Sequence, residues 1–351
     1  MASLVIQTSF LGDMVLTTPL LVRLAQRGPV DVVATPLAAP LLANHPAVRD
    51  VIVYDKRGVA SGVRGLLRTA RALRTRPTGE PRGATVAYLA QGSLRSATLA
   101  RLAGIHERVG FDTSAGRRFY TRLVPFDRSL HHAERLWRLA NVDDESPAAP
   151  LHPRLYPSSN DHAAAASLLQ SAGVAPGAPM IVLAPGSVWA TKRWPHFRSL
   201  AIALATDPRT SRARQVVMGG SGDSGLAREI ADGLQTVGAP LPIDATGRLP
   251  LLASAALLQR AGAIVTNDSL PLHLASAVGT PTVALFGPTT PELGFGPLTP
   301  SAEVLGVADL SCRPCHAHGP SACPLGHWRC MEELSVARVI DAVIDIMRFT
   351  R

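Results

Sequence analysis

The sequence predicts an α/β protein of two domains, each built on a parallel β-sheet. Short buried apolar runs alternate with helical segments along the chain, which is the pattern of repeated β–α units. A length of 351 residues is long for one domain and comfortable for two. Residues 143–160 are rich in proline, serine and charge, so we interpret them as the linker between the domains.

The composition is that of a globular protein with an anionic partner. Hydrophobic residues make up 46% of the chain and charged residues 17%, which excludes a disordered chain. The net charge of +9 favours a nucleotide, a phosphorylated glycan, a membrane surface or nucleic acid as partner. Almost all of the positive charge is arginine, because Lys56 and Lys192 are the two lysines of the chain.

The N-terminus does not resemble a signal peptide. Leu4–Gln7 is too short an apolar run, and no basic residue precedes Arg23. No apolar run reaches the roughly 18–20 residues of a membrane span. We therefore expect a cytoplasmic protein that contacts a membrane surface peripherally at most, with its cysteines as thiols or metal ligands rather than disulfides.

The first domain, residues 1–155, begins with a buried strand and a polar loop. The predicted strands are Leu4–Ile6, Val30–Ala34, Val51–Tyr54 and Thr85–Leu89. The loop that contains Asp13 follows the first strand and enters an apolar helix. Within that helix Pro19 either begins the regular turns, with Thr17 or Thr18 as the cap, or produces a kink.

Positive charge gathers after the third strand. Arg64, Arg68 and Arg71 recur at helical spacing and form one basic face, which is either a solvated surface or a cradle for a phosphorylated or membrane-anchored acceptor. After the strand Thr85–Leu89, a second polar loop with Ser93 and Arg95 enters a helix. Arg118 and its neighbours add further charge to this domain.

The second domain, residues 156–333, has three polar loops at one edge of its predicted sheet. The strand Met180–Ala184 runs into a Gly/Ser loop that holds Lys192 just before a helix, a plausible phosphate site without the spacing of a P-loop. A glycine-rich loop with Asp223 follows the next strand. The helix within residues 334–351 is amphipathic, and we expect it to pack back on the first domain.

The stretch Ala263–Pro288 is a β-loop-α-β unit with Asn267, Asp268 and Ser269 at the carboxyl end of its first strand. Open α/β sheets bind ligands at that edge, and free N–H groups at a helix start suit phosphate. A carboxylate repels phosphate, so Asp268 either caps the helix or accepts from sugar hydroxyls. The stretch predicts a nucleotide or sugar site.

These motifs together resemble bacterial glycosyltransferase family 9, the lipopolysaccharide heptosyltransferases. The resemblance rests on motifs that occur in one order over nearly the whole chain: Gly12-Asp13, Ser93-x-Arg95-Ser96, Pro185-Gly186-Ser187 with Lys192-Arg193-Trp194-Pro195, Asn267-Asp268-Ser269 with His273, and Cys323-Pro324 with His327 and Cys330-Met331. It implies a GT-B fold, in which two Rossmann-like domains with parallel sheets face each other across a cleft. The Cys323–Met331 segment favours the second heptosyltransferase of the inner core.

The resemblance also implies a reaction. The donor is ADP-L-glycero-β-D-manno-heptose, bound mainly by the C-terminal domain, and the acceptor is the heptosyl-Kdo-lipid A inner core, held by the N-terminal domain. Transfer inverts the anomeric centre and needs neither a metal nor another cofactor.

Residue roles follow by matching positions. Asp13 matches the catalytic aspartate; its alternative is an N-cap, and we favour the base because Thr17 and Thr18 are available as caps. Lys192 matches the phosphate-binding lysine and Asp268 the aspartate that binds the donor heptose. Further matches on the donor side are Ser187, Thr191, Asp223, Leu249, Ser269 and His273. The residues expected to bind the acceptor are Ser93, Arg95, Arg64, Arg68 and Arg118. The family's usual glycine after Asp268-Ser269 is Leu270 here.

The cysteines form a cluster of their own: Cys312, Cys315, Cys323 and Cys330, with His316, His318 and His327 nearby. They supply enough ligands for structural zinc, but the spacing after Cys315 matches no standard zinc knuckle. We favour reduced thiols in a packed loop.

Three other functions remain as alternatives: a family 9 transferase with a different acceptor, a sugar-nucleotide epimerase, and a sugar-nucleotide binding protein. Nucleic-acid binding rests on the basic charge alone, because the sequence has no helix-turn-helix, RNP or finger motif. We therefore expect no nucleic-acid partner.

Overall fold

The computed structural model describes residues 2–75, 83–141 and 146–348, and the chain divides into two compact units between Tyr156 and Pro157. Residues 143–145 of the predicted linker lie outside this description. Residues 146–158 contain no helix or strand, and the predicted end of the linker, residues 159–160, is already helical.

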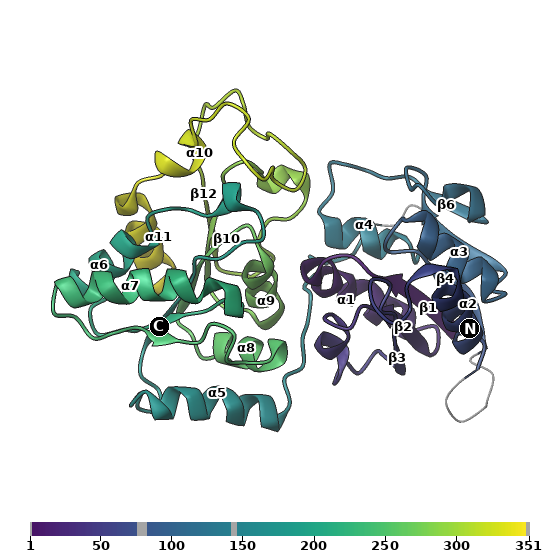
Figure 1. The fold of residues 1–351 in the computed structure, drawn as a ribbon, viewed down its shortest axis with the longest axis horizontal. Helices are drawn as coiled ribbons and strands as arrows, with labels where there is room; N and C mark the ends of the chain where they lie inside the picture. Colours follow the sequence, from purple (N-terminus) through teal and green to yellow (C-terminus); the bar gives the residue numbers. More distant parts are fainter. Residues whose placement is uncertain (1, 76–82, 142–145, 349–351) are drawn as a thin grey trace. The chain divides into compact units, whose positions relative to one another are not determined.

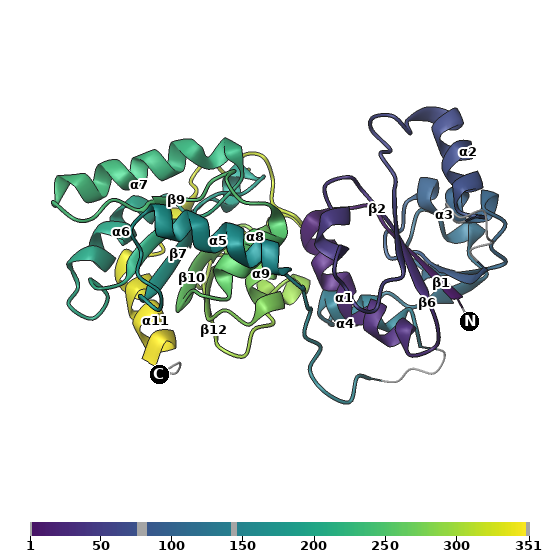
Figure 2. The ribbon, with the colours of Figure 1, turned by 90° about the horizontal axis from the view of Figure 1, so that it is seen from below.

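Unit 1 is one parallel sheet in the order β3-β2-β1-β4-β5-β6 (Figure 1). Its strands are β1 (Ala2–Gln7), β2 (Val30–Ala34), β3 (Asp50–Val53), β4 (Ala84–Tyr88), β5 (Glu107–Phe111) and β6 (Arg122–Val124). Helices α1 (Leu11–Ala25) and α4 (His132–Arg138) pack together on one face, and α2 (Gly62–Ala72) and α3 (Leu94–Leu102) on the other (Figure 2). The short turns η1 (Ala39–Leu42) and η2 (Arg117–Phe119) complete the unit. Because both faces are covered, the central strands read as continuous apolar runs.

Helix α1 accommodates Pro19 in its interior. Proline lacks the N–H that bonds to the carbonyl four residues earlier, here the carbonyl of Val15. The Thr18 hydroxyl donates to that carbonyl instead (2.8 Å), while the Thr17 hydroxyl donates to the carbonyl of Asp13 (2.6 Å). The prediction that Thr17 or Thr18 caps this helix is therefore wrong, since both lie inside a helix that begins at Leu11.

Unit 2 repeats the arrangement in the order β12-β11-β10-β7-β8-β9. Its strands are β7 (Met180–Ala184), β8 (Arg214–Val217), β9 (Ile243–Asp244), β10 (Ala263–Asn267), β11 (Thr282–Leu285) and β12 (Ala302–Leu305). The helices are α5 (Ser159–Ser171), α6 (Phe197–Thr206), α7 (Ser224–Thr236), α8 (Leu251–Leu258), α9 (Leu270–Val278), α10 (Arg329–Glu332) and α11 (Val336–Arg348), with short turns η3 (Ala190–Lys192), η4 (Ser221–Asp223) and η5 (Pro291–Leu293). Helices α5, α8 and α9 pack side by side, as do α7, α6 and α11 (Figure 1).

The C-terminal helix corrects one prediction. We expected it to pack on the first domain, but α11 contacts α6, β10, β11 and β12 of unit 2. Val339, Val343 and Ile346 recur along one face of α11 and are buried in the same core as β7 and β10. The amphipathic pattern thus predicted a buried face correctly, but it carried no information about which sheet covers that face.

Candidate functional site

Each sheet has a point where the strand order reverses direction, and the candidate site residues gather there. In unit 2 this point lies between β7 and β10, where successive crossovers run to opposite sides and the following loops diverge. The buried Asn267 side chain joins the two loops, since its Nδ2 donates to the carbonyl of Pro185 (2.8 Å) and its Oδ1 accepts from the N–H of Trp194 (3.1 Å). The loops after the two strands are thereby held as one surface.

Lys192 and Asp268 form a buried ion pair at this edge. Lys192 Nζ donates to Asp268 Oδ2 at 2.5 Å, and the two side chains are only 10% and 7% exposed. The Thr289 hydroxyl donates to the same carboxylate oxygen (2.7 Å). The two residues predicted to bind opposite ends of one donor are therefore partners in this structure, and a diphosphate that bound Lys192 would compete with Asp268 for its ammonium group.

Hydroxyl groups predicted as phosphate donors are engaged with the protein. Thr191 Oγ1 donates to the carbonyl of Pro320 (2.5 Å), and Ser269 Oγ donates to the carbonyl of Gly186 (3.3 Å). Ser187 Oγ accepts from the N–H of Trp189 (3.3 Å). Helix α9 begins directly after Ser269 and has no side-chain cap. Pro271 has no N–H, and the N–H of Leu272 donates to the carbonyl of Ser269 (3.1 Å), so Leu270 is the residue of this first turn whose N–H suits an anion.

Asp223 lies against the β7 loop although the two are far apart in sequence. Its Oδ2 accepts from the N–H of Gly220 (2.9 Å), and a Cβ at Gly186 would lie 2.4 Å from the same oxygen. Leu249 is half-buried just before α8. His273 is buried in α9, with its ring 6.4 Å from that of Phe295. Its burial and this ring contact give His273 a packing role between α9 and the segment after β11.

Asp13 closes the N-terminus of α1 with one carboxylate oxygen. Its Oδ2 accepts from the Ser9 hydroxyl (2.6 Å) and from the N–H of Phe10 (3.4 Å), as a capping carboxylate does. The argument that Thr17 and Thr18 leave Asp13 free of capping is therefore wrong. Its other oxygen, Oδ1, lies 3.8 Å from His132 Nε2, and the Asp13 side chain keeps 18% exposure. A carboxylate that caps with one oxygen still has the second for a proton.

Sequence reasoning missed His132 and passed over Lys56. His132 is the first residue of α4, and only the packing of α4 on α1 brings it to Asp13. Lys56 follows β3, and its Nζ donates to the carbonyl of Thr8 (2.6 Å). Burial, and then the charges of Arg57 and Arg95, lower the pKa of Lys56. The scarcity of lysine was the one sequence signal that pointed to it.

Ser93 and Arg95 are fixed by their own unit. Ser93 caps α3, since its Oγ accepts from the N–H of Ser96 (3.1 Å) and donates to Gln91 Oε1 (3.0 Å). Arg95 donates to the Tyr54 hydroxyl and to the carbonyl of Ala60 (3.0 Å). Both residues thus support the loops of unit 1 at its own reversal point, between β1 and β4.

The remaining basic residues of unit 1 stay at the surface. Arg64, Arg68 and Arg71 are exposed on α2, and Arg118 is exposed in η2. Arg68 also donates to the carbonyl of Val59. Their exposure makes α2 a basic surface, as the helical spacing predicted.

The four cysteines of unit 2 line one cavity of about 310 Å³, together with His327. All four are free thiols, and Cys330 is the most buried. Burial raises the pKa of Cys330 to about 11. Burial also raises the pKa of Cys323, but hydrogen bonds from the backbone N–H groups of Trp328, Leu325, His327 and Gly326 outweigh it, so this thiol ends below its ordinary pKa.

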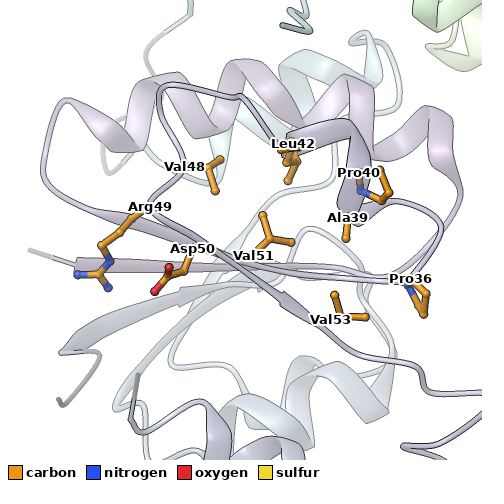
Figure 3. A pocket seen from close by; sticks show the side chains of 10 residues that line it. Pro36, Ala39, Pro40, Leu42, Val48, Arg49, Asp50, Val51 and Val53 are labelled. Atoms are coloured by element: carbon orange, nitrogen blue, oxygen red, sulfur yellow. The ribbon is translucent and has the colours of Figure 1, made fainter. Parts of the chain in front are cut away.

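A second cavity lies away from the reversal points. It has a volume of about 530 Å³ and lies between η1 and the edge strand β3 (Figure 3). Leu42, Val51 and Val53 make much of its lining apolar, and Arg49 at its rim pairs with Asp31 (2.7 Å). Arg49 and Asp50 are its charged lining residues, and because the cavity lies away from the loops that carry the candidate site residues, we assign it no part in the candidate site.

Comparison with known proteins identifies the family. Residues 78–325 match glycosyltransferase family 9 (heptosyltransferase). The chain is also 32% identical to lipopolysaccharide heptosyltransferase 1 of Pseudomonas aeruginosa, over 90% of this chain and 86% of that protein. The chain belongs to glycosyltransferase family 9. This family 9 glycosyltransferase is similar as well to lipopolysaccharide heptosyltransferase 2 of Escherichia coli K12, at 28% identity over 87% of this chain and 88% of that protein.

Solved structures of the family share the fold. The family 9 glycosyltransferase of Veillonella parvula superposes with a TM-score of 0.84 at 24% identity, covering 99% of this chain and 97% of that one. E. coli ADP-heptose LPS heptosyltransferase II gives 0.81 at 24% identity, covering 100% and 99%. E. coli heptosyltransferase WaaC, crystallised with ADP, gives 0.69 at 21% identity, covering 98% and 100%. The predicted GT-B fold with two Rossmann-like parallel sheets is confirmed.

Membrane contact was expected at the surface only. Across residues 2–75, 83–141 and 146–348, no helix combines the length and the apolar character needed to cross a bilayer.

Proposed function

We propose that this family 9 glycosyltransferase moves L-glycero-D-manno-heptose from ADP-heptose to the heptosyl-Kdo-lipid A inner core of lipopolysaccharide, with inversion at the anomeric carbon. Relatives that cover most of the chain are named lipopolysaccharide heptosyltransferase 1 and 2. E. coli WaaC structures hold ADP and an ADP-2-deoxy-2-fluoro heptose. The buried Lys192–Asp268 pair at the β7/β10 edge is the observation that carries the proposal.

The donor half of the proposed site has one group for each part of ADP-heptose. Lys192 supplies a compact positive charge for the diphosphate, and the uncapped start of α9 supplies the N–H of Leu270. Asp268 then accepts from heptose hydroxyls. These groups neutralise the charge that develops on the leaving ADP, so the transfer itself needs no metal in this mechanism.

The attacking half of the proposed site is Asp13. An inverting transfer needs one base that takes the acceptor proton as the hydroxyl attacks the anomeric carbon. Asp13 Oδ2 is used by the cap, and its Oδ1 faces His132. We assign Oδ1 as the proton acceptor. Asp13 belongs to unit 1 and Lys192 to unit 2, so the proposal assigns proton removal and leaving-group stabilisation to different domains.

The basic face of α2 suits an anionic acceptor. Arg64, Arg68 and Arg71 project from consecutive turns of an exposed helix, and Arg118 adds charge from η2. Phosphates on the lipid A core and anionic lipids both attract such a face. We therefore place the enzyme in the cytoplasm, with peripheral contact to the inner face of the inner membrane.

Relatives named lipopolysaccharide heptosyltransferase 1 and 2 both match the chain, so the choice of acceptor rests on a further feature. The Cys323–Met331 segment favours the second heptosyltransferase. A bare Kdo core or a later core heptose are the alternatives within the family. Assays with acceptors that carry or lack the first heptose distinguish them, and transfer to the bare Kdo core alone would exclude the second-heptose assignment.

The test of Asp13 uses a control that the chain supplies. Asp161 caps α5 as Asp13 caps α1, since its Oδ2 accepts from the N–H (2.8 Å) and the hydroxyl (2.6 Å) of Ser158. Asp13→Asn keeps a capping oxygen but removes the base, so kcat should fall by about 10²–10⁴-fold. Asp161→Asn should leave kcat unchanged. ADP binding should survive in both variants.

Two outcomes would count against this assignment. Near-normal transfer by Asp13→Asn would exclude the carboxylate as the base, and an equal loss in both variants would show that capping is the cause. For the donor, thermal-shift measurements with ADP, UDP, GDP and ADP-heptose should give stabilisation by the adenine nucleotides alone. An epimerase or a pure binding protein would bind ADP-heptose without transferring it to any core acceptor.

A further inference from the structure

The segment between β12 and α10, residues 306–328, contains no helix or strand of its own. It exceeds the about 12–15 residues that loops in compact domains usually reach without internal structure. Arg313 anchors its start by donating to the carbonyls of Phe286 (3.0 Å) and Thr289 (3.3 Å) and to those of Gly287 and Val307. The centre of the segment needs another source of order.

That centre contains three of the four cysteines, and the fourth lies at the start of α10. Their common cavity of about 310 Å³ is otherwise lined by Pro314, Pro324, Leu325 and His327. Cys312 Sγ lies 3.9 Å from His327 Nε2, and Cys315 Sγ donates to the carbonyl of Cys312 (2.9 Å). Four sulfur ligands around one small, mostly apolar space are a soft ligand set, the kind that zinc and iron prefer.

The turn after Cys323 returns the chain toward the other cysteines. The N–H of Gly326 donates to the carbonyl of Cys323 (3.1 Å), and His327, the next residue, lies 3.9 Å from the Cys312 sulfur. The turn therefore brings Cys323 to the same cavity as Cys312, Cys315 and Cys330.

We propose that Cys312, Cys315, Cys323 and Cys330 bind one Zn²⁺ ion through four thiolates. Among the described residues no three potential ligands stand ready around one point, so the thiols must turn inward on binding. Cys315 gives up its bond to the carbonyl of Cys312, and the four thiol protons pass to solvent. His327 stays outside the ligand set and contacts the Cys312 sulfur as a supporting group.

The proposed zinc site of Cys312, Cys315, Cys323 and Cys330, called the zinc clip below, lies in the loop that covers Lys192. The carbonyl of Pro320 accepts from Thr191, and a Cβ at Gly319 would lie 3.0 Å from Lys192 Cε. Both residues fall between Cys315 and Cys323, so four thiolate bonds would fix the cover of Lys192. The clip is structural and takes no part in bond making. Its effect on the donor rests on the proposed function, whereas metal binding does not.

The first experiment measures metal in the full-length protein, purified under reducing conditions without added chelator. Zinc and iron analysis should find about one zinc per chain, as a closed tetrahedral site requires. Cys315→Ser and Cys323→Ser should each lose it, while His318→Ala, which changes a side chain outside the cavity lining, should retain it. If the serine variants fail to fold, Co²⁺ substitution in the wild-type protein gives the answer through the intense visible and near-ultraviolet bands of tetrahedral cobalt thiolate.

Three results would overturn the proposal: four titratable thiols with no bound metal, two disulfides in the folded protein, or iron accompanied by acid-labile sulfide. A second experiment removes zinc with a chelator. The apoprotein should have a lower Tm and weaker ADP binding, both restored by zinc. Stoichiometric zinc in a protein that binds no ADP would keep the clip and refute only the donor site.

Discussion

The buried Lys192–Asp268 pair permits a quantitative test of the structure at the β7/β10 edge of unit 2. At 2.5 Å and an effective dielectric constant of about 20, Coulomb attraction is worth about 7 kcal/mol, and desolvation of the two charges offsets most of it. The pair as a whole therefore contributes little to stability. Removing one partner is different, because the remaining charge stays buried without compensation and costs about 3–5 kcal/mol.

A double-mutant cycle separates these terms. Lys192→Met and Asp268→Asn should each destabilise unit 2, and the double variant should recover most of the loss, with a coupling of at least about 2 kcal/mol. Because two units need not unfold together, the free energy should be measured by native-state hydrogen exchange at β10 amides. Arg209 and Asp207 provide the control, since that 2.6 Å pair has a 50% exposed arginine and should couple far more weakly than Lys192 and Asp268.

Equal coupling in the two cycles would refute the reasoning. A double variant whose loss of stability equals the sum of the two single losses would also refute it. Either result means that Lys192 and Asp268 do not share a buried contact in solution.

Two further predictions follow, one for each unit. Burial lowers the pKa of His45 from 6.5 to about 4. Between these two pH values His45 binds a proton in the unfolded chain but not in the folded one, so the free energy of unfolding falls as the pH drops from 6.5 to 4, by up to about 3 kcal/mol. Urea unfolding of unit 1 at pH values between 7 and 4 should show this fall in the free energy of unfolding. His45→Asn should make the free energy less dependent on pH, and an unchanged pH dependence would exclude His45 as its source. In unit 2, Gly186→Ala brings a Cβ to 2.4 Å from Asp223 Oδ2 and should cost about 1–3 kcal/mol in thermal unfolding. Adding Asp223→Ala should restore most of the lost stability. If it restores none, the new Cβ does not clash with Asp223.

Local pattern determined most of the architecture. The continuous apolar runs at β1, β7 and β10 predict strands buried on both faces, and the polar residues after them predict the reactive edge. Polar or short elements escaped prediction: β5 and β6 carry arginine and glutamate, and α4 has only seven residues. Such elements are held by neighbours rather than by a pattern of their own.

The sequence by itself determined the fold class, the family resemblance and the loops that carry Asp13, Lys192 and Asp268, because these depend on residue types at short spacing. Tertiary structure decided which of these side chains meet. It paired Lys192 with Asp268, brought His132 to Asp13, and placed α11 on the sheet of unit 2. It also gathered the four cysteines around one cavity. Contacts between residues that are distant in the chain depend on how helices and loops pack on each sheet. The spacing of hydrophobic residues along the chain does not encode that packing.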